Sequence, residues 1–535
     1  MKKYFDKFIK YIILLSILII ISWIISLIMP SLVGKFIDLL VYENNINYVK
    51  KYIYVFIIFS LINIFNSYIV NIFTIKIQTK MCFSINFDII EHLKKIPFLK
   101  IVKYDPIYLT QRITTDSNIL ISFFLNNYLN FFFKFITIIF SFYILYSIDI
   151  TLTLILFSFI PVYIFLYILL KNTLYKLNLK NKNSQNLFFS KLTEQITNIK
   201  SIKINSSFEL YKLKVEKAFK IMFKDLVAFS KISYLSSGLD NVLSAVASSI
   251  IFFMGGIKVI NGDFSIGDFT IITTYFNMIM STLSYYLNIG KSFQDCKSSF
   301  IRIKELLDIS IEVNGNKFIE NLDEIQLDKI SFSYENKSIF NDFSYTFKSG
   351  NIYCIKGNNG VGKSTLLNII IGLIESEEGS VYFNKINIKE LDMYKIRKDF
   401  FSIIPQDYIL KDVELENTIK EIKTNKQFIN ISNYLNKSID IFEFLDKIEL
   451  NFSETESNTF SGGENQKLSI FNVFFKNAKV IIMDEPTSSL DKKSINLLKK
   501  ILLAIKKDKL IILISHDKYF GDICDEYIDL NNKKV

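Results

Sequence analysis

Gly357-Asn358-Asn359-Gly360-Val361-Gly362-Lys363-Ser364 follows a short apolar run, Tyr353–Ile355. The stretch fits Gly-x4-Gly-Lys-[Ser/Thr], a loop whose bare backbone amides wrap a polyphosphate. The strand-like run before it and the helix-like run Ser364–Ile371 after it are the context that this loop needs, because the new helix points its positive N-terminus at the phosphates. The stretch predicts an α/β nucleotide-binding domain in which Lys363 reaches the β- and γ-phosphates and Ser364 holds Mg²⁺.

A second motif, Ser461-Gly462-Gly463-Glu464, lies further along the chain and is followed by the apolar run Val480–Met483. That run ends in Asp484-Glu485. A carboxylate at the end of a hydrophobic strand is typical of a Mg²⁺ ligand in such folds, which assigns Asp484 to the metal. The neighbouring Glu485 would then activate water. The alternative is a pair of solvated acids at a strand end.

Three further residues lie at positions from which a side chain would contact a bound nucleotide. His516 follows the strand-like run Leu510–Ile514 and is one of only two histidines. Gln406 follows the run Phe401–Ile404 and can ligate Mg²⁺ or water and sense the γ-phosphate. Tyr334 precedes the glycine loop and can stack on adenine. Each could instead be an ordinary surface residue, and the other histidine, His92, is interpreted as a polar residue without a chemical role.

The composition divides the chain into two parts. Of its 535 residues, 50% are hydrophobic and 15% aromatic, more than a soluble domain carries. The excess ends at about Leu287. The net charge of +11 would suit a nucleic-acid binder, but many lysines follow apolar runs, which is typical of a membrane protein with positive cytoplasmic loops. We therefore expect membrane lipid and no nucleic acid among the partners.

Six apolar runs come close to or reach the length of about 20 residues that a membrane-spanning helix needs. They are Tyr11–Met29, Tyr52–Ile75, Phe131–Tyr146, Thr151–Leu170, Leu239–Ile260 and Phe269–Leu287. The lysine-rich stretches between them predict that both termini are cytoplasmic. The polar stretches Lys76–Asn126 and Lys171–Ser237 keep helical periodicity, so we expect helical stalks with elbows near Phe98–Tyr108 and Ile204–Leu210.

From about Asn321 short strand-like runs alternate with helical ones, which predicts a parallel sheet with ligand chemistry at the strand ends. The predicted fold is an all-α six-helix transmembrane domain over residues 1–310, a linker over 311–324, and an α/β P-loop nucleotide-binding domain over 325–535. The four cysteines, Cys82, Cys296, Cys354 and Cys524, show no zinc spacing. They are predicted to be reduced thiols.

Taken together, these motifs resemble the ATP-binding cassette (ABC) transporters, and in particular exporters that fuse a six-helix membrane domain to a cassette. The resemblance covers nearly the whole chain. Tyr334 matches the adenine-stacking loop, Gly357–Thr365 matches the phosphate loop, and Gln406 matches the Q-loop. Ser461–Gly463 matches the signature, and Asp484-Glu485 matches the metal and catalytic pair. Ser488–Asp491 matches the D-loop, which ends in Asp491, and His516 matches the switch histidine. In the membrane half, Gln111–Asp116, Asn261–Gly267 and Ser299–Ile303 look like exporter segments.

The resemblance implies a half-transporter that binds ATP and Mg²⁺ and works as a dimer, favouring a homodimer because Glu485 and the signature glycines are present. Each nucleotide would lie between the phosphate loop of one subunit and Ser461–Gly463, with Glu464, of the other. Departures include Glu464 in place of the usual glutamine and Lys467 where arginine is common. The implied location is the inner or plasma membrane, with the cassette in the cytoplasm.

The cargo is the least constrained part of this interpretation. The cassette style, with Gln406-Asp407-Tyr408-Ile409, looks similar to exporters of bacteriocins and other antimicrobial peptides. Lys134, an ionisable residue close to or inside the membrane, would face a cargo cavity or reach the membrane interface. Aromatic and amide side chains of the sixth span would suit a large amphipathic cargo, although helix packing accounts for most of them equally well: Tyr275, Phe276, Asn277, Tyr285, Tyr286 and, just beyond, Asn288. A lipid or multidrug exporter and a non-transporting ATP sensor are the alternatives.

Overall fold

The computed structural model describes residues 2–42, 46–104, 106–335, 337–405, 462–476, 478–515 and 518–531. The chain divides into two compact units. The first comprises Met1–Leu93 and Asp105–Ile309, and the second comprises Lys94–Tyr104 and Ser310–Val535. The short segment Lys94–Tyr104 therefore groups with residues that lie far away from it in the sequence. In keeping with this, the backbone N–H of Glu312 donates to the carbonyl oxygen of Lys95 at 2.7 Å.

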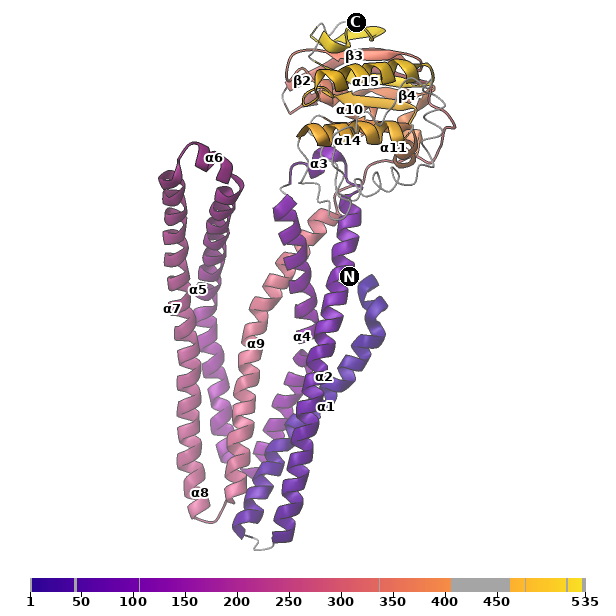
Figure 1. Ribbon diagram of the computed structural model, residues 1–535. Helices are drawn as coiled ribbons and strands as arrows, with labels where there is room; N and C mark the ends of the chain where they lie inside the picture. The colour runs from indigo at the N-terminus through magenta and orange to yellow at the C-terminus, as the bar shows by residue number, and fades with distance from the viewer. Residues whose placement is uncertain are drawn as a thin grey trace. The chain divides into compact units, whose positions relative to one another are not determined.

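The first unit is built of long helices (Figure 1). They are α1 (Lys2–Tyr42), α2 (Ile46–Leu93), α4 (Pro106–Ile148), α5 (Ile150–Thr197), the short α6 (Ile199–Ile204), α7 (Phe208–Ile250), the π-helical turn η1 (Ile251–Gly255), α8 (Gly256–Ile260) and α9 (Ile266–Leu307). The six predicted spans fall on α1, α2, α4, α5, α7 to α8, and α9. Among the described residues, five helices are long and apolar enough to cross a membrane; α9, which carries the sixth predicted span, is not one of them.

Apolar side chains cover the outside of these helices. Ile64 and Phe65 on α2, for example, are 67% and 66% exposed. Such a surface is costly in water but suits hydrocarbon, where each backbone polar group is satisfied inside its own helix. The helices are also much longer than a bilayer core requires, as the predicted stalks imply.

The two predicted elbows are short helices or turns. The first contains α3 (Phe98–Ile101), which belongs to the second unit, and its Leu99 packs against the apolar core of that unit. The second lies at the turn between α6, which ends at Ile204, and α7, which begins at Phe208 (Figure 1). Helices α4 and α5 are joined by a single residue, Asp149, whose side chain caps α5 by accepting from the Leu152 N–H at 2.7 Å.

An ion pair with a buried carboxylate joins two of the exporter-like segments, which are far apart in the sequence. Asp116 on α4 is 2% exposed and accepts from Arg302 on α9 in a bidentate arrangement, with a 2.8 Å bond from Nε. Arg112, one helical turn earlier on α4, donates to the Arg302 carbonyl oxygen at 2.7 Å and to Glu305 at 2.6 Å. These bonds hold α4 against α9 at the end of the unit that carries the polar stalks.

The third exporter-like segment, Asn261–Gly267, forms a close helix crossing. A Cβ at Gly267 would lie 2.2 Å from the Gly34 carbonyl oxygen on α1, so only glycine fits there. Asp38, also on α1, accepts from the Gly267 N–H at 2.7 Å and from the Ser265 hydroxyl at 2.8 Å. The end of α1 is thus fixed to the start of α9.

The second unit contains two sheets. The four-stranded sheet, which the sequence did not predict, has the order β2-β1-β4-β5 with antiparallel pairing throughout: β1 (Glu324–Tyr334), β2 (Lys337–Lys348), β4 (Glu378–Phe383) and β5 (Ile386–Asn387). The five-stranded sheet has the order β6-β7-β8-β3-β9: β3 (Ile352–Lys356), β6 (Phe401–Ile404), β7 (Val480–Asp484), β8 (Leu510–Ile514) and β9 (Glu526–Asp529).

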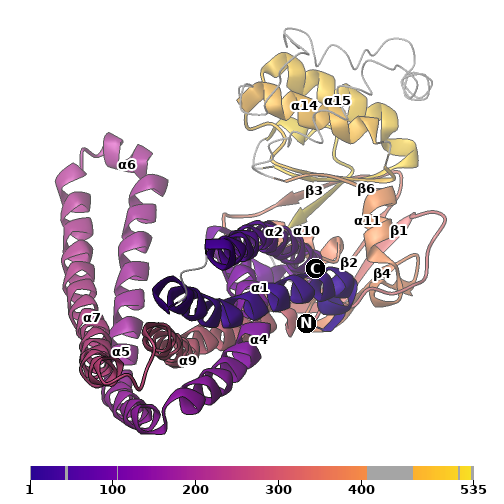
Figure 2. The same ribbon diagram turned by 90° about the horizontal axis from the view of Figure 1, so that it is seen from below.

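All four pairings in the five-stranded sheet are parallel. This confirms the predicted parallel sheet, and four of its strands lie at or within one residue of the predicted runs. Alternate side chains enter two cores: Ile512 faces the core that includes α10 (Lys363–Ile370) and α11 (Met393–Phe400), whereas Ile511 faces the core that includes α14 (Gly462–Phe475) and α15 (Lys492–Ile505). Figure 2 shows α14 and α15 together on one side of this sheet. Helices on both faces explain why the strands are continuously apolar.

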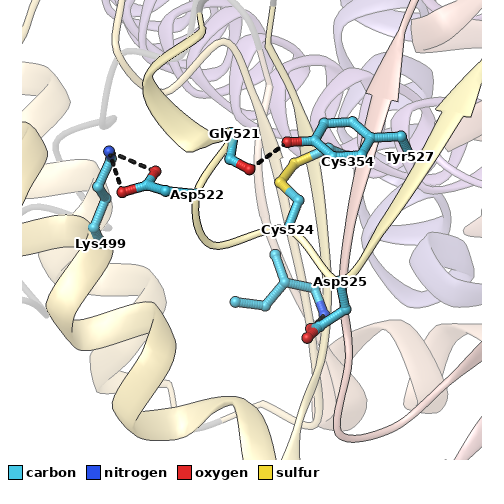
Figure 3. Close-up of a disulfide and its surroundings, with 8 residues drawn as sticks. Cys354, Lys499, Gly521, Asp522, Cys524, Asp525 and Tyr527 are labelled. Atoms are coloured by element: carbon cyan, nitrogen blue, oxygen red, sulfur yellow. Dashed lines mark hydrogen bonds and ion pairs between the residues drawn. A yellow bond between two sulfur atoms is a disulfide. The ribbon is translucent and has the colours of Figure 1, made fainter.

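The prediction that all four cysteines are reduced is wrong for one pair. Cys354 on β3 and Cys524, just before β9, form a disulfide with a Cα–Cα distance of 5.9 Å (Figure 3). The two residues are 170 positions apart and meet because β9 pairs beside β3, a proximity that spacing in the sequence cannot reveal. Cys82 and Cys296 are free, as predicted.

Candidate nucleotide-binding site

The glycine loop lies between β3 and α10, as its pattern predicts. Gly360 and Gly362 have positive φ values of 78° and 113°, which side chains other than glycine rarely adopt. A Cβ at Gly362 would also lie 2.4 Å from Ile339 Cγ2 on β2. Gly362 is the N-cap residue of α10, so the loop delivers its backbone to the positive end of a new helix, where anions bind.

Lys363 lies across this loop. Its Nζ donates to the carbonyl oxygens of Gly357 at 2.8 Å and Asn358 at 3.3 Å. Burial lowers the pKa of Lys363, and the carboxylates of Glu485 and Asp484 act in the opposite direction by favouring its charged form. A lysine whose ammonium lies against the loop carbonyls and close to two carboxylates fits a group that binds phosphate in the presence of a metal ion.

Ser364 and Asp484, the two described residues predicted to hold Mg²⁺, are in direct contact. The Ser364 hydroxyl donates to Asp484 Oδ2 at 3.0 Å. Asp484 ends β7 and is 6% exposed. A hydroxyl and a carboxylate brought together beside a phosphate loop are the oxygen ligands that Mg²⁺ takes in nucleotide sites. The residues present therefore fit a Mg²⁺–nucleotide complex.

Glu485 has an unusual backbone. Its φ is 51°, the left-handed region that a non-glycine residue seldom adopts and that clusters at functional sites. Its N–H donates to the carbonyl oxygen of Ile514, the last residue of β8, at 2.9 Å. Glu485 is thus fixed at the carboxyl end of the parallel sheet, directly after Asp484, the residue that contacts Ser364.

Other residues predicted to bind ATP lie on the loop, on α10 and at the end of β1. Thr365 is buried on α10, and the Asn358 N–H donates to Asn531 Oδ1 at 3.0 Å. Tyr334 ends β1 and is 40% exposed, and its ring lies edge-on to the Phe332 ring with the two centroids 4.9 Å apart. Asn531 carried no sequence signal, because it follows the last strand and meets the loop only through the sheet.

The second motif begins α14. Gly462, Gly463 and Glu464 are the first three residues of that helix. Asp491, the predicted D-loop residue, is the N-cap of α15 and accepts from the Ser494 hydroxyl at 2.5 Å. This hydrogen bond, with help from the Lys467 ammonium 3.5 Å away, lowers the pKa of Asp491. Lys467, which stands where arginine is common, thus forms an ion pair between α14 and the D-loop.

Three predicted site residues, Gln406, Ser461 and His516, lie outside the residues that the structure describes. Their roles stay predictions.

Two family models match the chain. The first is described as the ABC transporter transmembrane region and covers residues 12–283. The second is described as ABC transporter and covers residues 340–488. The matched regions follow the division of the sequence into an apolar and a soluble part.

The names of the curated relatives describe different transported substances. The chain is 27% identical to a lactococcin-G-processing and transport ATP-binding protein of Lactococcus lactis subsp. lactis, over 70% of this chain and 54% of the relative. It is 25% identical to an ATP-dependent lipid A-core flippase of Haemophilus ducreyi, over 56% and 53%, and 26% identical to a microcin-J25 export ATP-binding/permease protein of Escherichia coli, over 61% and 57%. The chain spans about half the length of the curated relatives it matches.

A solved structure shares the fold. A bacterial Atm1-family ABC exporter with ATP bound superimposes with a TM-score of 0.82, at 15% identity, over 98% of this chain and 94% of that one. The helical unit and the two-sheet unit are therefore both parts of a known architecture. Since the transmembrane-region model alone covers more than half of the sequence and the cassette model follows it, this chain is a membrane-integral member of the ABC transporter family, with a transmembrane domain fused to an ATP-binding cassette.

Proposed function

We propose that the protein is an ATP-driven exporter that hydrolyses ATP to move an amphipathic substrate out of the cytoplasm by alternating access. The hydrogen bond between Ser364 and Asp484 carries this proposal, because it joins the phosphate loop to the acidic end of β7. Two motifs separated in the sequence thereby form one polar site at the carboxyl edge of the parallel sheet, where α/β folds bind ligands.

In this site the loop amides of residues 357–365 and the Lys363 ammonium bind the phosphates, and Tyr334 stacks on adenine. Ser364 and Asp484, with Gln406, hold Mg²⁺, which neutralises charge on the phosphate oxygens when bound. Glu485 accepts a proton from the attacking water. His516 contacts the γ-phosphate.

The working unit that we propose is a dimer with two such sites. Each nucleotide contacts the phosphate loop of one subunit and Ser461–Gly463 and Glu464 of the other. We favour a homodimer because this chain has both Glu485 and the signature glycines; the alternative is a heterodimer with a second half-transporter subunit. Both termini and the cassette would lie in the cytoplasm, and the membrane would be the inner or plasma membrane.

An amphipathic peptide, such as a bacteriocin or other antimicrobial peptide, is the proposed cargo. Two relatives are named for lactococcin G and microcin J25. Of the residues considered from the sequence, Tyr275 and Phe276 are 0% and 2% exposed and belong to the helix packing, whereas Lys134 is half-buried on α4. Tyr285 contacts Asn127 on α4 through a 3.0 Å hydrogen bond.

A lipid is the second candidate cargo, since another relative is named as a lipid A-core flippase. The two are separated by reconstituting the purified chain in liposomes with the cassette outward. We expect ATP-dependent accumulation of a labelled amphipathic peptide, and stimulation of ATP hydrolysis by that peptide. Movement of a labelled lipid between leaflets without peptide accumulation would assign the lipid instead. ATP hydrolysis with neither movement would overturn the exporter proposal.

A further inference from the structure

Gln466 lies near the start of α14, three residues beyond the signature glycine Gly463, and its amide contacts a different motif. Its Nε2 donates to the Glu485 carbonyl oxygen at 3.2 Å and to the Ser488 hydroxyl at 3.2 Å. Its Oε1 accepts from the Ser489 N–H at 2.8 Å. One side chain therefore uses both ends of its amide to hold the turn that leads from Glu485 to the D-loop.

The backbone that Gln466 holds is the strained one. Glu485 has a φ of 51°, and such a conformation persists only when its surroundings over-determine it. Its N–H is fixed from β8 by the Ile514 carbonyl oxygen. Its carbonyl oxygen accepts from Gln466 and, at 3.3 Å, from the Ser488 N–H within the same turn. The direction in which the Glu485 side chain leaves the sheet thus depends partly on α14.

Two further contacts join the same pair of segments. A Cβ at Gly463 would lie 2.9 Å from the Ser489 carbonyl oxygen, so this signature glycine packs closely against the D-loop. Lys467 forms an ion pair with Asp491 at 3.5 Å. Positions 463, 466 and 467 thus meet the segment 485–491 along one side of α14, and a shift of the start of α14 would be transmitted to Glu485.

We propose that Gln466 is a positioning residue that couples the signature helix of each cassette to the backbone of its own Glu485. This inference rests on the proposed function, in which the signature segment of one subunit meets the nucleotide of the other. Closure of the signature on the partner's nucleotide would then set the orientation of Glu485 in the same subunit. The two sites of the dimer would thereby be linked through Gln466.

The test replaces Gln466 by methionine, which has a similar length and shape but neither donates nor accepts comparable hydrogen bonds. We expect kcat for ATP hydrolysis by the purified, liposome-reconstituted Gln466→Met protein to fall by about ten-fold, because the water-activating group is misaligned. The KM for ATP should stay within about two-fold, since the phosphate loop is untouched. The Hill coefficient for ATP should fall towards one if the two sites become uncoupled.

A double-mutant cycle with Ser488→Ala tests the contact itself. Ser488→Ala removes one acceptor of the Gln466 amide, so its effect on kcat should be smaller in the Gln466→Met background than in the wild type. The exposed amide Asn496 on α15 provides the control, because Asn496→Ala removes an amide from the same unit without touching this turn. Asn496→Ala should leave kcat, KM and melting temperature unchanged.

Two results would overturn the inference. One is a Gln466→Met protein with wild-type kcat and Hill coefficient. The other is a parallel loss of kcat, ATP affinity and melting temperature, which would make Gln466 a purely structural residue. If the wild-type protein itself hydrolysed no ATP, the proposed function would fail instead. If Glu485→Gln abolished hydrolysis but Gln466→Met left it unchanged, only the proposed coupling through Gln466 would be wrong.

Discussion

Strand β8 of the cassette and helix α4 of the membrane unit are both rich in isoleucine, but they use it differently. Ile512 on β8 is fully buried in the core of the cassette, whereas Ile139 on α4 is 54% exposed. In the cassette, water drives apolar side chains into the core. In the membrane unit the surroundings are as apolar as the side chains, so the helices rely on close packing and on a few polar contacts.

The largest effect is expected when the same substitution, isoleucine to alanine, is made in the cassette and in the membrane unit. Ile512→Ala removes buried methyl groups from a packed core, at a cost of about 2–5 kcal/mol. The melting temperature of the cassette should fall by roughly 5–15 °C in a thermal unfolding scan. Ile139→Ala in the same protein, held in lipid, is the matched control and should change it little. Equal losses for both variants would contradict the assignment of α4's outer face to lipid.

The next largest effect concerns the phosphate loop. Lys363→Ala removes the charge that we assign to the phosphates, a contribution of about 1.5–3 kcal/mol for a charge-assisted hydrogen bond. ATP affinity measured by fluorescent-nucleotide displacement should fall by roughly 10- to 100-fold. Lys356→Ala, at the end of β3 just before the loop and packed over Tyr527, serves as control and should bind ATP normally. Normal binding by both variants would remove Lys363 from the site.

The polar contacts of the membrane unit predict a smaller effect. Arg302→Met leaves the buried Asp116 carboxylate without its bidentate partner. Because the Arg302 side chain is 40% exposed, we discount the usual cost of breaking a buried pair to about 1–2 kcal/mol. The unit should melt a few degrees lower in lipid nanodiscs. The exposed pair Lys3–Asp88 is the comparison: Lys3→Met should have almost no effect, and an equal loss would argue against a special role for Asp116.

The cysteines of the two units differ in their oxidation state, which can be measured without changing the protein. Cys354 and Cys524 in the cassette are bonded, whereas Cys82 in the membrane unit is buried and free. Alkylation of the denatured, unreduced protein should therefore label two thiols, and alkylation after reduction should label four. Mass spectrometry reads the count directly. Four labelled thiols before reduction would show that the pair is reduced in solution.

The sequence predicted those parts of the molecule that depend on local pattern. Apolar runs with turn residues at their ends located β3, β6, β7 and β8, and the glycine spacing located the loop between β3 and α10. The antiparallel sheet was missed because its strands carry bulges and register shifts, which blur the alternation that marks a half-buried strand. Contacts such as Gln466 with Glu485 and Cys354 with Cys524 arise only when distant segments pack together.

Glu485→Gln tests the central claim most directly, because it changes one atom of the proposed base and leaves the binding groups in place. The measurement compares ATP binding and steady-state ATP hydrolysis by wild-type and Glu485→Gln protein in the same liposomes. We predict binding within about two-fold of wild type and turnover reduced by about 100-fold or more, the usual contribution of a general base. Hydrolysis by Glu485→Gln at the wild-type rate would contradict the account.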